Sequence, residues 1–187
     1  DVYKRQILSV MGNMDANLNT RLSAHEAETW TRVWACHMKL PSTLDAQLKR
    51  DAGVTYFEFQ ALLNVAKAPK KSLRMTELAD ATMMSLSHLS RVVTRLEKKG
   101  LVSRTPDPND GRSTFATLTP AGTKTVDAGL PGHVGEMRRI MFDNLSDYEM
   151  EVVSSALAKM AAALAEPARP VVADSPLVGE SSGLDAA

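Results

Sequence analysis

Apolar residues recur at intervals of three and four along most of the chain, which is the spacing of the buried face of an α-helix. A Ser or Thr followed three residues later by Glu, the capping-box spacing, begins three of these stretches, at Ser23, Thr55 and Ser146. We therefore expect a mainly helical fold. The predicted helices cover residues 23–53, 55–66, 77–82, 85–99, 119–141 and 146–164.

Prolines and glycines fall inside two of these predicted helices. Pro41 has no amide hydrogen and its ring clashes with the preceding turn, so it should kink or break the helix over residues 23–53. Gly129, Pro131 and Gly132 should bend the helix over residues 119–141.

The centre of the chain carries a helix-turn-helix pattern followed by a hairpin. A short extended run at residues 73–75 precedes a helix that Thr76 is expected to cap, and Ser85 caps a longer helix that ends at Gly100. The longer helix has one apolar face and one polar, basic face, which is typical of the second helix of this motif. Residues 101–105 and 113–118 are predicted strands, and the Pro- and Gly-containing turn between them makes the pair a hairpin, or wing.

Charge is unevenly distributed although the 187-residue chain has 22 basic and 22 acidic residues and a formal net charge of zero. Residues 67–112 contain ten Lys and Arg against five Asp and Glu, which gives this stretch +5 and the remainder −5. A concentrated basic segment is typical of phosphate binding. Charge alone fits a solvated surface equally well.

The two ends of the chain carry little folding information. Residues 1–22 lack clear periodicity and are expected to be a flexible segment, and residues 166–187, rich in Pro, Gly and Ser, are expected to be a disordered tail. No apolar stretch is long enough for a membrane helix and no leader begins the sequence, so we expect a cytoplasmic protein. The single cysteine, Cys36, excludes an internal disulfide.

The same central residues resemble the MarR (multiple-antibiotic-resistance regulator) family of transcription regulators. The resemblance is carried by Met75–Thr82, Ser85–Arg104, Asp107–Arg112 and Leu118–Gly122. It implies a winged helix-turn-helix over residues 54–119, held in a domain over residues 23–165 whose outer parts, 23–53 and 120–165, form a dimerisation frame. It also implies a homodimer that binds a pseudo-palindromic operator in double-stranded DNA, and the two-fold axis would place two recognition helices about 34 Å apart or a multiple of that distance.

The resemblance assigns DNA contacts to polar residues of the recognition helix and the wing. Asp110 and Arg112 match the Asp and Arg that brace the family's wing, although Gly111 stands where another Arg is common. Lys98 is equally consistent with solvated surface. The candidate DNA contacts are Thr76, Ser85, Ser87, His88, Ser90, Arg91, Thr94, Arg95, Lys98, Asn109 and Arg112.

The family commonly responds to small phenolic or aromatic acids, which implies an effector and a cleft for it. The candidate lining residues are Trp30, Trp34, His37, Tyr56 and Phe57, for each of which simple helix packing is the commoner explanation. A regulator of this kind is expected to be a repressor that the effector releases from DNA. An architectural DNA-binding dimer without an effector is the main alternative.

Other chemistries have weaker support in the sequence. Cys36 permits a thiol-based redox sensor, as in some relatives, but a free cysteine is more often a small buried apolar residue. His25, Glu26, His37 and His133 are too scattered to predict a zinc site. No nucleophile elbow, phosphate-binding glycine loop or paired-histidine metal helix is present, so neither an enzyme nor a cofactor is expected.

Overall fold

The computed structural model describes residues 22–107 and 110–166, apart from the side chains of residues 111 and 112. It divides into two compact units, the first ending at Asn144 and the second beginning at Leu145. The expectations for a flexible N-terminal segment and a disordered tail concern residues that, except for Leu22 and Glu166, lie outside this range.

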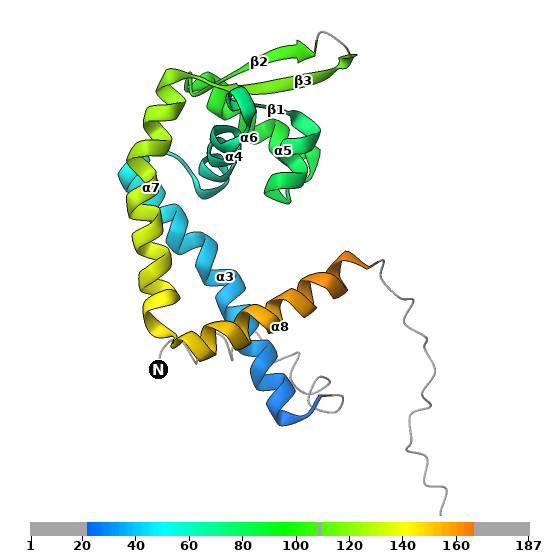
Figure 1. Cartoon of the computed structure of the whole chain (residues 1–187), viewed down its shortest axis with the longest axis vertical. Helices are drawn as coiled ribbons and strands as arrows, with labels where there is room; N and C mark the ends of the chain where they lie inside the picture. The colour runs from blue at the N-terminus through cyan, green and yellow to red at the C-terminus, as the bar shows by residue number, and fades with distance from the viewer. Residues whose placement is uncertain (1–21, 108–109, 167–187) are drawn as a thin grey trace, which may run out of the picture. The chain divides into compact units, whose positions relative to one another are not determined.

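The first unit is helical except for one small sheet (Figure 1). Long helices α3 and α7 pack against each other, and α4, α5 and α6 form a compact group beside the sheet. The fold class predicted from the sequence, mainly α with a small β wing, is confirmed. The elements of this unit are α3 (Ala24–Ala52), α4 (Tyr56–Lys67), the 3-10 turn η1 (Pro69–Lys71), β1 (Ser72–Arg74), α5 (Met75–Thr82), α6 (Leu86–Lys98), β2 (Val102–Asp107), β3 (Asp110–Leu118), α7 (Pro120–Ile140) and η2 (Phe142–Asn144).

The sheet contains the predicted hairpin and one further strand. Its order is β1-β3-β2, and both pairings are antiparallel. The extended run near residue 73 becomes the third strand, with Leu73 opposite Ala116, and β3 starts three residues earlier than predicted. The wing is therefore tied to the segment that leads into α5.

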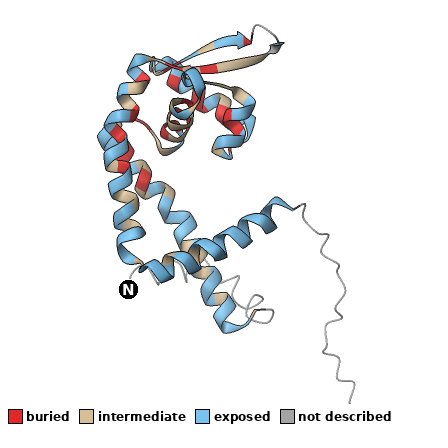
Figure 2. Ribbon diagram, in the orientation of Figure 1, coloured by how far each residue is buried: buried red, intermediate tan, exposed pale blue. Residues whose placement is uncertain are grey.

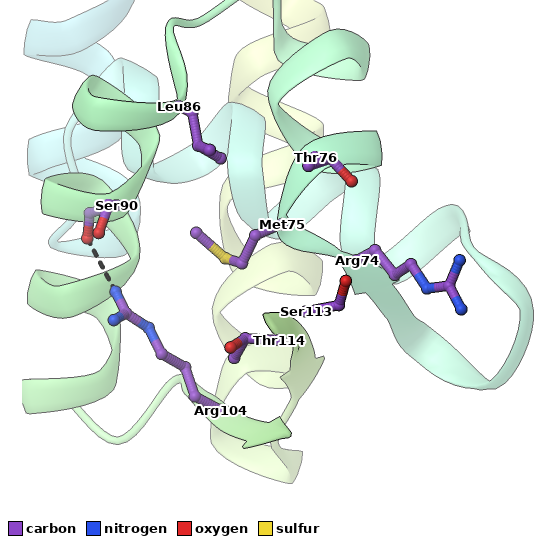
Figure 3. A pocket seen from close by; sticks show the side chains of 8 residues that line it. All are labelled: Arg74, Met75, Thr76, Leu86, Ser90, Arg104, Ser113 and Thr114. Atoms are coloured by element: carbon purple, nitrogen blue, oxygen red, sulfur yellow. Dashed lines mark hydrogen bonds between the residues drawn. The ribbon is translucent and has the colours of Figure 1, made fainter. Parts of the chain in front are cut away.

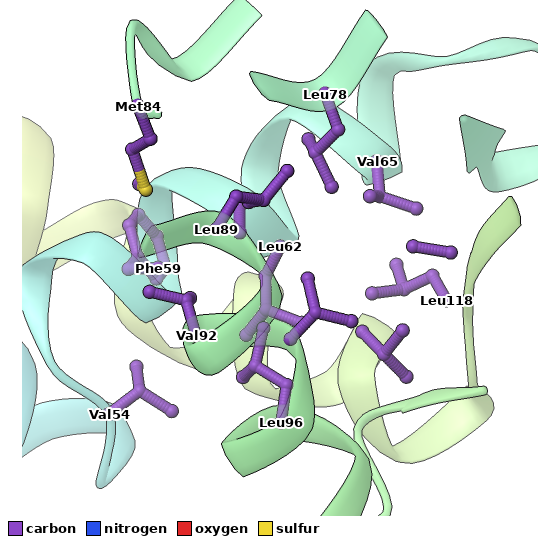
Figure 4. Close-up of a cluster of buried hydrophobic side chains, with 14 of the residues drawn as sticks. Val54, Phe59, Leu62, Val65, Leu78, Met84, Leu89, Val92, Leu96 and Leu118 are labelled. Carbon is purple, nitrogen blue, oxygen red and sulfur yellow. The ribbon is translucent and has the colours of Figure 1, made fainter. Parts of the chain in front are cut away.

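The hydrophobic core of this unit lies where α4, α5 and α6 meet the sheet and the start of α7 (Figures 2 and 4). Burying each large apolar side chain contributes roughly 1.5–3 kcal/mol, so this cluster is the main source of stability in the winged helix. Its most deeply buried large residues are Leu48, Val54, Phe59, Leu62, Val65, Leu78, Leu89, Val92, Val93 and Leu96.

Helix α3 continues through Pro41, so the break considered from the sequence does not occur. Two side-chain hydroxyl groups help to satisfy the backbone around the proline. Ser42 Oγ and Thr43 Oγ1 donate to the carbonyl oxygen of Lys39 at 2.9 Å and 3.0 Å. The carbonyl oxygen that loses its helical donor at Pro41 is that of His37, so these bonds reinforce the turn around the proline and do not replace the missing one.

Helix α7 is also continuous across the residues expected to bend it. Two of its glycines instead permit close helix packing. A Cβ atom on Gly129 would lie 2.7 Å from Phe59 Cε2, and one on Gly132 would lie 2.4 Å from Asp51 Oδ2. Gly129 thus allows α7 to approach α4, and Gly132 allows it to approach α3.

The start of α5 differs from the sequence prediction. Thr76 is not the N-cap, because Met75 is already helical and Arg74 occupies the cap position. The Glu77 carboxylate accepts the backbone amide of Arg74 at 3.2 Å, which fixes this earlier start. Thr76 is an exposed residue in the first turn.

The second unit contains α8 (Asp147–Ala165), which begins at the predicted Ser146 capping box. Ser146 Oγ accepts the Glu149 amide, and Glu149 in turn accepts the Ser146 amide. None of the residues of α8, all of which the structure describes, is buried. Large apolar side chains at Val152, Leu157, Met160 and Leu164 are exposed on it.

Candidate nucleic-acid interface

Helix α6 presents one apolar and one polar face, as predicted for a recognition helix. Leu89, Val92, Val93 and Leu96 are buried in the core. The start of the helix is fixed by Ser85, whose Oγ accepts the His88 amide at 3.3 Å. The predicted DNA contacts on the opposite face are exposed at Ser85, Ser87, Arg91, Arg95 and Lys98, and half-buried at His88, Ser90 and Thr94.

The two predicted base-reading arginines have different surroundings. Arg95 Nε donates to Glu58 Oε1 at 3.2 Å, so its guanidinium is paired within the fold. Arg91 is exposed and forms no ion pair within the part of the chain that the structure describes. Arg91 therefore has the more available guanidinium.

Glu58 is a buried carboxylate that joins α4 to the end of α6. Its side chain is 1% exposed and accepts the Thr55 amide at 2.9 Å as well as Arg95 and Lys99. Burial alone would raise the pKa of Glu58, but hydrogen bonds from Lys99 and Thr55 and the Lys99 charge outweigh it and lower the pKa. The sequence identified Glu58 as part of a capping box and gave no signal for its ion pairs.

Arg104 of β2 reaches the recognition helix, a contact that the sequence analysis missed. Its Nη2 donates to the carbonyl oxygen of Ser90 and to Thr94 Oγ1, both at 2.8 Å. Thr94 Oγ1 itself donates to Ser90 O at 2.8 Å. Ser90 and Thr94, two predicted DNA contacts, are thus also the residues on which the wing is anchored.

An ion pair holds the wing to the start of α5. Arg74 contacts Asp107 Oδ2 through Nε at 2.9 Å and through Nη2 at 2.6 Å, and the Asp107 side chain is buried. The Arg74 guanidinium also lies 5.6 Å from the centre of the Phe115 ring. Sequence reasoning placed Arg74 only in the basic segment, because nothing local pairs it with a residue 33 positions away.

Arg74 and Arg104 line a cleft between α5, α6 and the wing (Figure 3). Its volume is about 260 Å³, and hydroxyl and guanidinium groups share its surface with apolar side chains. The lining residues are Arg74, Met75, Thr76, Leu86, Ser90, Arg104, Ser113 and Thr114.

The tip of the wing is only partly described. Asn109 and the side chain of Arg112 lie outside the described residues, so the predicted Asp110–Arg112 brace stays a prediction. Asp110 Oδ2 accepts a 2.7 Å hydrogen bond from Ser113 Oγ in β3.

The predicted effector-binding residues fall into two groups. Trp30, Trp34 and His37 stack in sequence on the N-terminal half of α3, with neighbouring ring centroids 6.5 Å and 5.5 Å apart. Tyr56 begins α4, where its amide donates to Asp45 Oδ1 at 2.8 Å. Since His37 and Asp45 are eight residues apart on one helix, about 12 Å separates the two groups along α3.

The second group connects α4 to the recognition helix and to α7. The ring centroids of Phe57 and His88 of α6 are 5.0 Å apart, and those of Tyr56 and His133 of α7 are 6.3 Å apart. His133 is buried, its Nδ1 has no hydrogen-bond partner among the described residues, and burial lowers its pKa. Sequence analysis considered His133 only as a zinc ligand.

The remaining chemical features are few. Cys36 is an exposed free thiol, so the expectation of a buried residue is wrong for this cysteine, and its redox role stays untested. Within the described residues, no three His, Cys, Asp or Glu side chains are grouped so as to hold a metal ion. Among the helices described, none combines the length and hydropathy needed to cross a membrane.

Comparisons with known proteins agree with this geometry. The model of the MarR family matches residues 52–113. The structure is similar to Sco3205, a MarR family transcriptional regulator from Streptomyces coelicolor solved in complex with DNA, with 36% identity, a TM-score of 0.75, and coverage of 78% of this chain and 91% of that one. It is also similar to AbsC, a MarR family regulator from the same organism, with 32% identity, a TM-score of 0.73, and coverage of 76% and 96%.

A curated relative extends the comparison to another organism. The transcriptional regulator HosA of Escherichia coli O111:H- is 31% identical over 96 residues, which make up 51% of this chain and 70% of HosA. These relatives are regulators and not enzymes. Together with the wing and the amphipathic α6, they establish that this chain belongs to the MarR family of transcription regulators.

Proposed function

We propose that this regulator binds double-stranded DNA by placing α6 in the major groove and the β2–β3 wing against the neighbouring minor groove. One observation carries the proposal: α6 buries an apolar face in the core, exposes Ser85, Ser87 and Arg91, and is bonded to the wing through Arg104. Short polar side chains at a helix start approach base edges, and an arginine binds guanine through two hydrogen bonds.

Charge and similarity add independent support. The +5 segment over residues 67–112 includes α5, α6 and most of the hairpin, so attraction to phosphates concentrates on this part of the chain. Sco3205, a similar protein, was solved in complex with DNA. The remaining proposed contacts are Thr76, His88, Ser90, Thr94, Arg95, Lys98, Asn109 and Arg112.

The protein acts as a homodimer in this proposal. Trp30, Trp34 and Met38 are 47%, 41% and 57% exposed along α3, and α8 exposes apolar side chains along its length. Contiguous apolar surface of this kind is unfavourable in water and marks an interaction surface. A second copy of the chain covers both helices, and its recognition helix reads the second half-site of a pseudo-palindromic operator.

The regulation that fits best is repression relieved by a small aromatic acid. The Phe57 ring contacts His88 of the recognition helix, and Tyr56 contacts His133 of α7. A ligand that displaced either ring would act directly on the elements that carry and support α6. A constitutive architectural dimer lacks this response and is the alternative outcome.

Selection of duplexes from a random-sequence library by the full chain tests DNA binding, and titration of the selected duplex by fluorescence anisotropy measures affinity. Arg91→Ala should weaken binding by about 1–3 kcal/mol if Arg91 reads a base. Lys124→Ala, an exposed lysine of α7 outside the proposed face, is the matched control and should bind normally. Equal affinity for both variants contradicts the assignment, and aromatic acids that leave affinity unchanged contradict the effector.

A further inference from the structure

The outer half of the wing is attached to the rest of the fold with little apolar packing. Ser103, Thr105 and Pro106 of β2 are exposed, and Ser113, Thr114 and Phe115 of β3 are only half-buried. Of the buried apolar residues of the hairpin, Val102 and Leu118 lie at its base and Ala116 lies opposite Arg104, and none lies farther out than this pair. The direction of the outer wing must therefore be fixed mainly by polar contacts.

Arg104 provides the contact to the recognition helix. A single nitrogen, Nη2, bonds both Ser90 O and Thr94 Oγ1, one turn apart on α6. Of these two acceptors only Thr94 Oγ1 belongs to a side chain, and Arg104 Nε also lies 3.8 Å from Glu97 Oε2 of the same helix. Because the guanidinium is charged, each of these bonds is stronger than a neutral hydrogen bond.

Asp107 provides the contact to the other helix of the motif. It stands at the end of β2 and pairs with Arg74, the residue that caps α5. Arg104 and Asp107 are three residues apart on one strand, so this strand is anchored separately to α6 and to α5. The pairing of β3 with β1 holds the inner part of the wing, and these two contacts add side-chain anchors on two different helices that fix its direction.

We propose that Arg104 and the Arg74–Asp107 pair are positioning residues that set the angle between the wing and the recognition helix. This inference rests on the proposed function and adds to it a specific requirement. The angle decides whether the wing meets the minor groove while α6 lies in the major groove. Thr94 contributes as the acceptor that holds Arg104, independently of any contact of its own with DNA.

Variants of Thr94 and Arg104, singly and combined, separate positioning from direct DNA contact. Thr94→Val keeps the shape of the side chain and removes the hydroxyl, and Thr94→Ser keeps the hydroxyl and is the matched control. On a duplex selected by the wild-type chain, Thr94→Val should bind about tenfold more weakly and Thr94→Ser within about twofold of wild type. Arg104→Gln should resemble Thr94→Val, and the double variant should be no weaker than Arg104→Gln alone.

Footprinting supplies a readout that general destabilisation does not change. At saturating protein, Thr94→Val and Asp107→Asn should lose hydroxyl-radical protection in the minor groove beside the half-sites. Protection of guanine N7 in the major groove from methylation should remain. A variant that is merely less stable loses both kinds of protection together, and thermal unfolding of each variant checks its folded fraction.

Three outcomes overturn the inference. The first is a Thr94→Val variant that equals wild type in affinity and footprint. The second is a double variant in which the losses of the two single variants multiply, and the third is an equal loss of protection in both grooves. Each of these can arise only when the wild-type chain binds DNA. A wild-type chain that selects no duplex contradicts the proposed function itself, which is a separate result.

Discussion

Lys99 Nζ lies 2.8 Å from Glu58 Oε2, so the residue that ends the recognition helix is bound to the first turn of α4. Arg95 contacts the other oxygen of the same carboxylate. The buried Glu58 carboxylate thus binds Arg95 within α6 and Lys99 at its C-cap. This single side chain couples the position of α6 to the start of α4.

Glu58→Gln should destabilise the fold by about 1–3 kcal/mol, because the charge-assisted bonds to Lys99 and Arg95 are lost. Since the folded state lowers the pKa of Glu58, its contribution is fully present above the unfolded-state value near 4.3 and is lost as pH falls through the folded value. Urea unfolding of wild type and variant at pH 7 and pH 3.5 measures both effects. The difference between them should be smaller at the lower pH.

Glu151→Gln in exposed α8 is the control for removal of a single acid and should change stability by less than about 0.5 kcal/mol. If the Glu58→Gln and Glu151→Gln variants are equally stable, the ion pairs of Glu58 with Arg95 and Lys99 contribute nothing measurable to the stability of the fold.

His133 should make the fold sensitive to mild acid. Burial lowers its pKa in the folded state, so below the unfolded-state value near 6.5 the unfolded chain binds a proton that the folded chain does not. Stability therefore falls as pH decreases from about 6.5 toward the lowered value. His133→Gln should flatten this part of the profile of Tm against pH, and a profile as steep as that of wild type contradicts the prediction.

His25→Gln is the control, because His25 is exposed near the start of α3 and does not pack in the core. Its profile of Tm against pH should follow that of wild type.

Two glycines of α7, Gly135 and Gly129, should respond differently to alanine. Gly135→Ala meets no atom within 4 Å, so its better helix propensity should stabilise the protein by up to about 1 kcal/mol. Gly129→Ala would place Cβ 2.7 Å from the buried Phe59 ring and should cost about 1–3 kcal/mol. Denaturant unfolding that ranks Gly129→Ala above Gly135→Ala in stability would show that α7 does not pack closely on α4.

Arg95→Ala should reduce both stability and operator binding, since its guanidinium pairs with Glu58 while remaining half-exposed. Arg91→Ala should reduce binding without lowering Tm, because Arg91 supports no ion pair in the described structure. Thermal unfolding and anisotropy titration of the two variants separate these effects. Identical Tm values for the two variants would mean that the Glu58 pair does not stabilise the fold.

Trp34→Ala should weaken the proposed dimer, because Trp34 stacks between Trp30 and His37 on the exposed side of α3. Sedimentation velocity over a range of concentrations should show the variant dissociating at higher concentration than wild type. Tyr148→Ala, which removes a more exposed aromatic residue in the first turn of α8, tests whether any exposed ring suffices. Equal dissociation of wild type and Trp34→Ala would exclude this part of α3 from the interface.

The sequence predicted the elements whose signals are local. Capping boxes at Ser23, Thr55 and Ser146 lie where the helices begin, and the apolar spacing within α6 identified its buried face. Local signals were less reliable at Pro41 and Thr76. At Pro41 the helix continues although one donor is missing, and at Thr76 the Glu77 carboxylate selects an earlier cap.

The residues that organise the candidate site were mostly not predictable. Glu58 meets Lys99, and Arg74 meets Asp107, across 41 and 33 positions of sequence. Neither pairing follows from periodicity, because each depends on how α4, α6 and the wing pack. The basic segment was visible as charge, but its division into paired residues such as Arg95 and unpaired ones such as Arg91 required the fold.

The short strand β1 limits where the length of this chain can change. Ser72, Leu73 and Arg74 pair with Thr117, Ala116 and Phe115, and Arg74 is also the cap of α5. One residue inserted between Phe115 and Thr117 would shift both strand pairings and pull the start of α5 out of place. Residues added between Asp107 and Asp110 leave every one of those pairs intact. Length variation among functional homologues should therefore concentrate at the end of the wing and be excluded from the middle of β3.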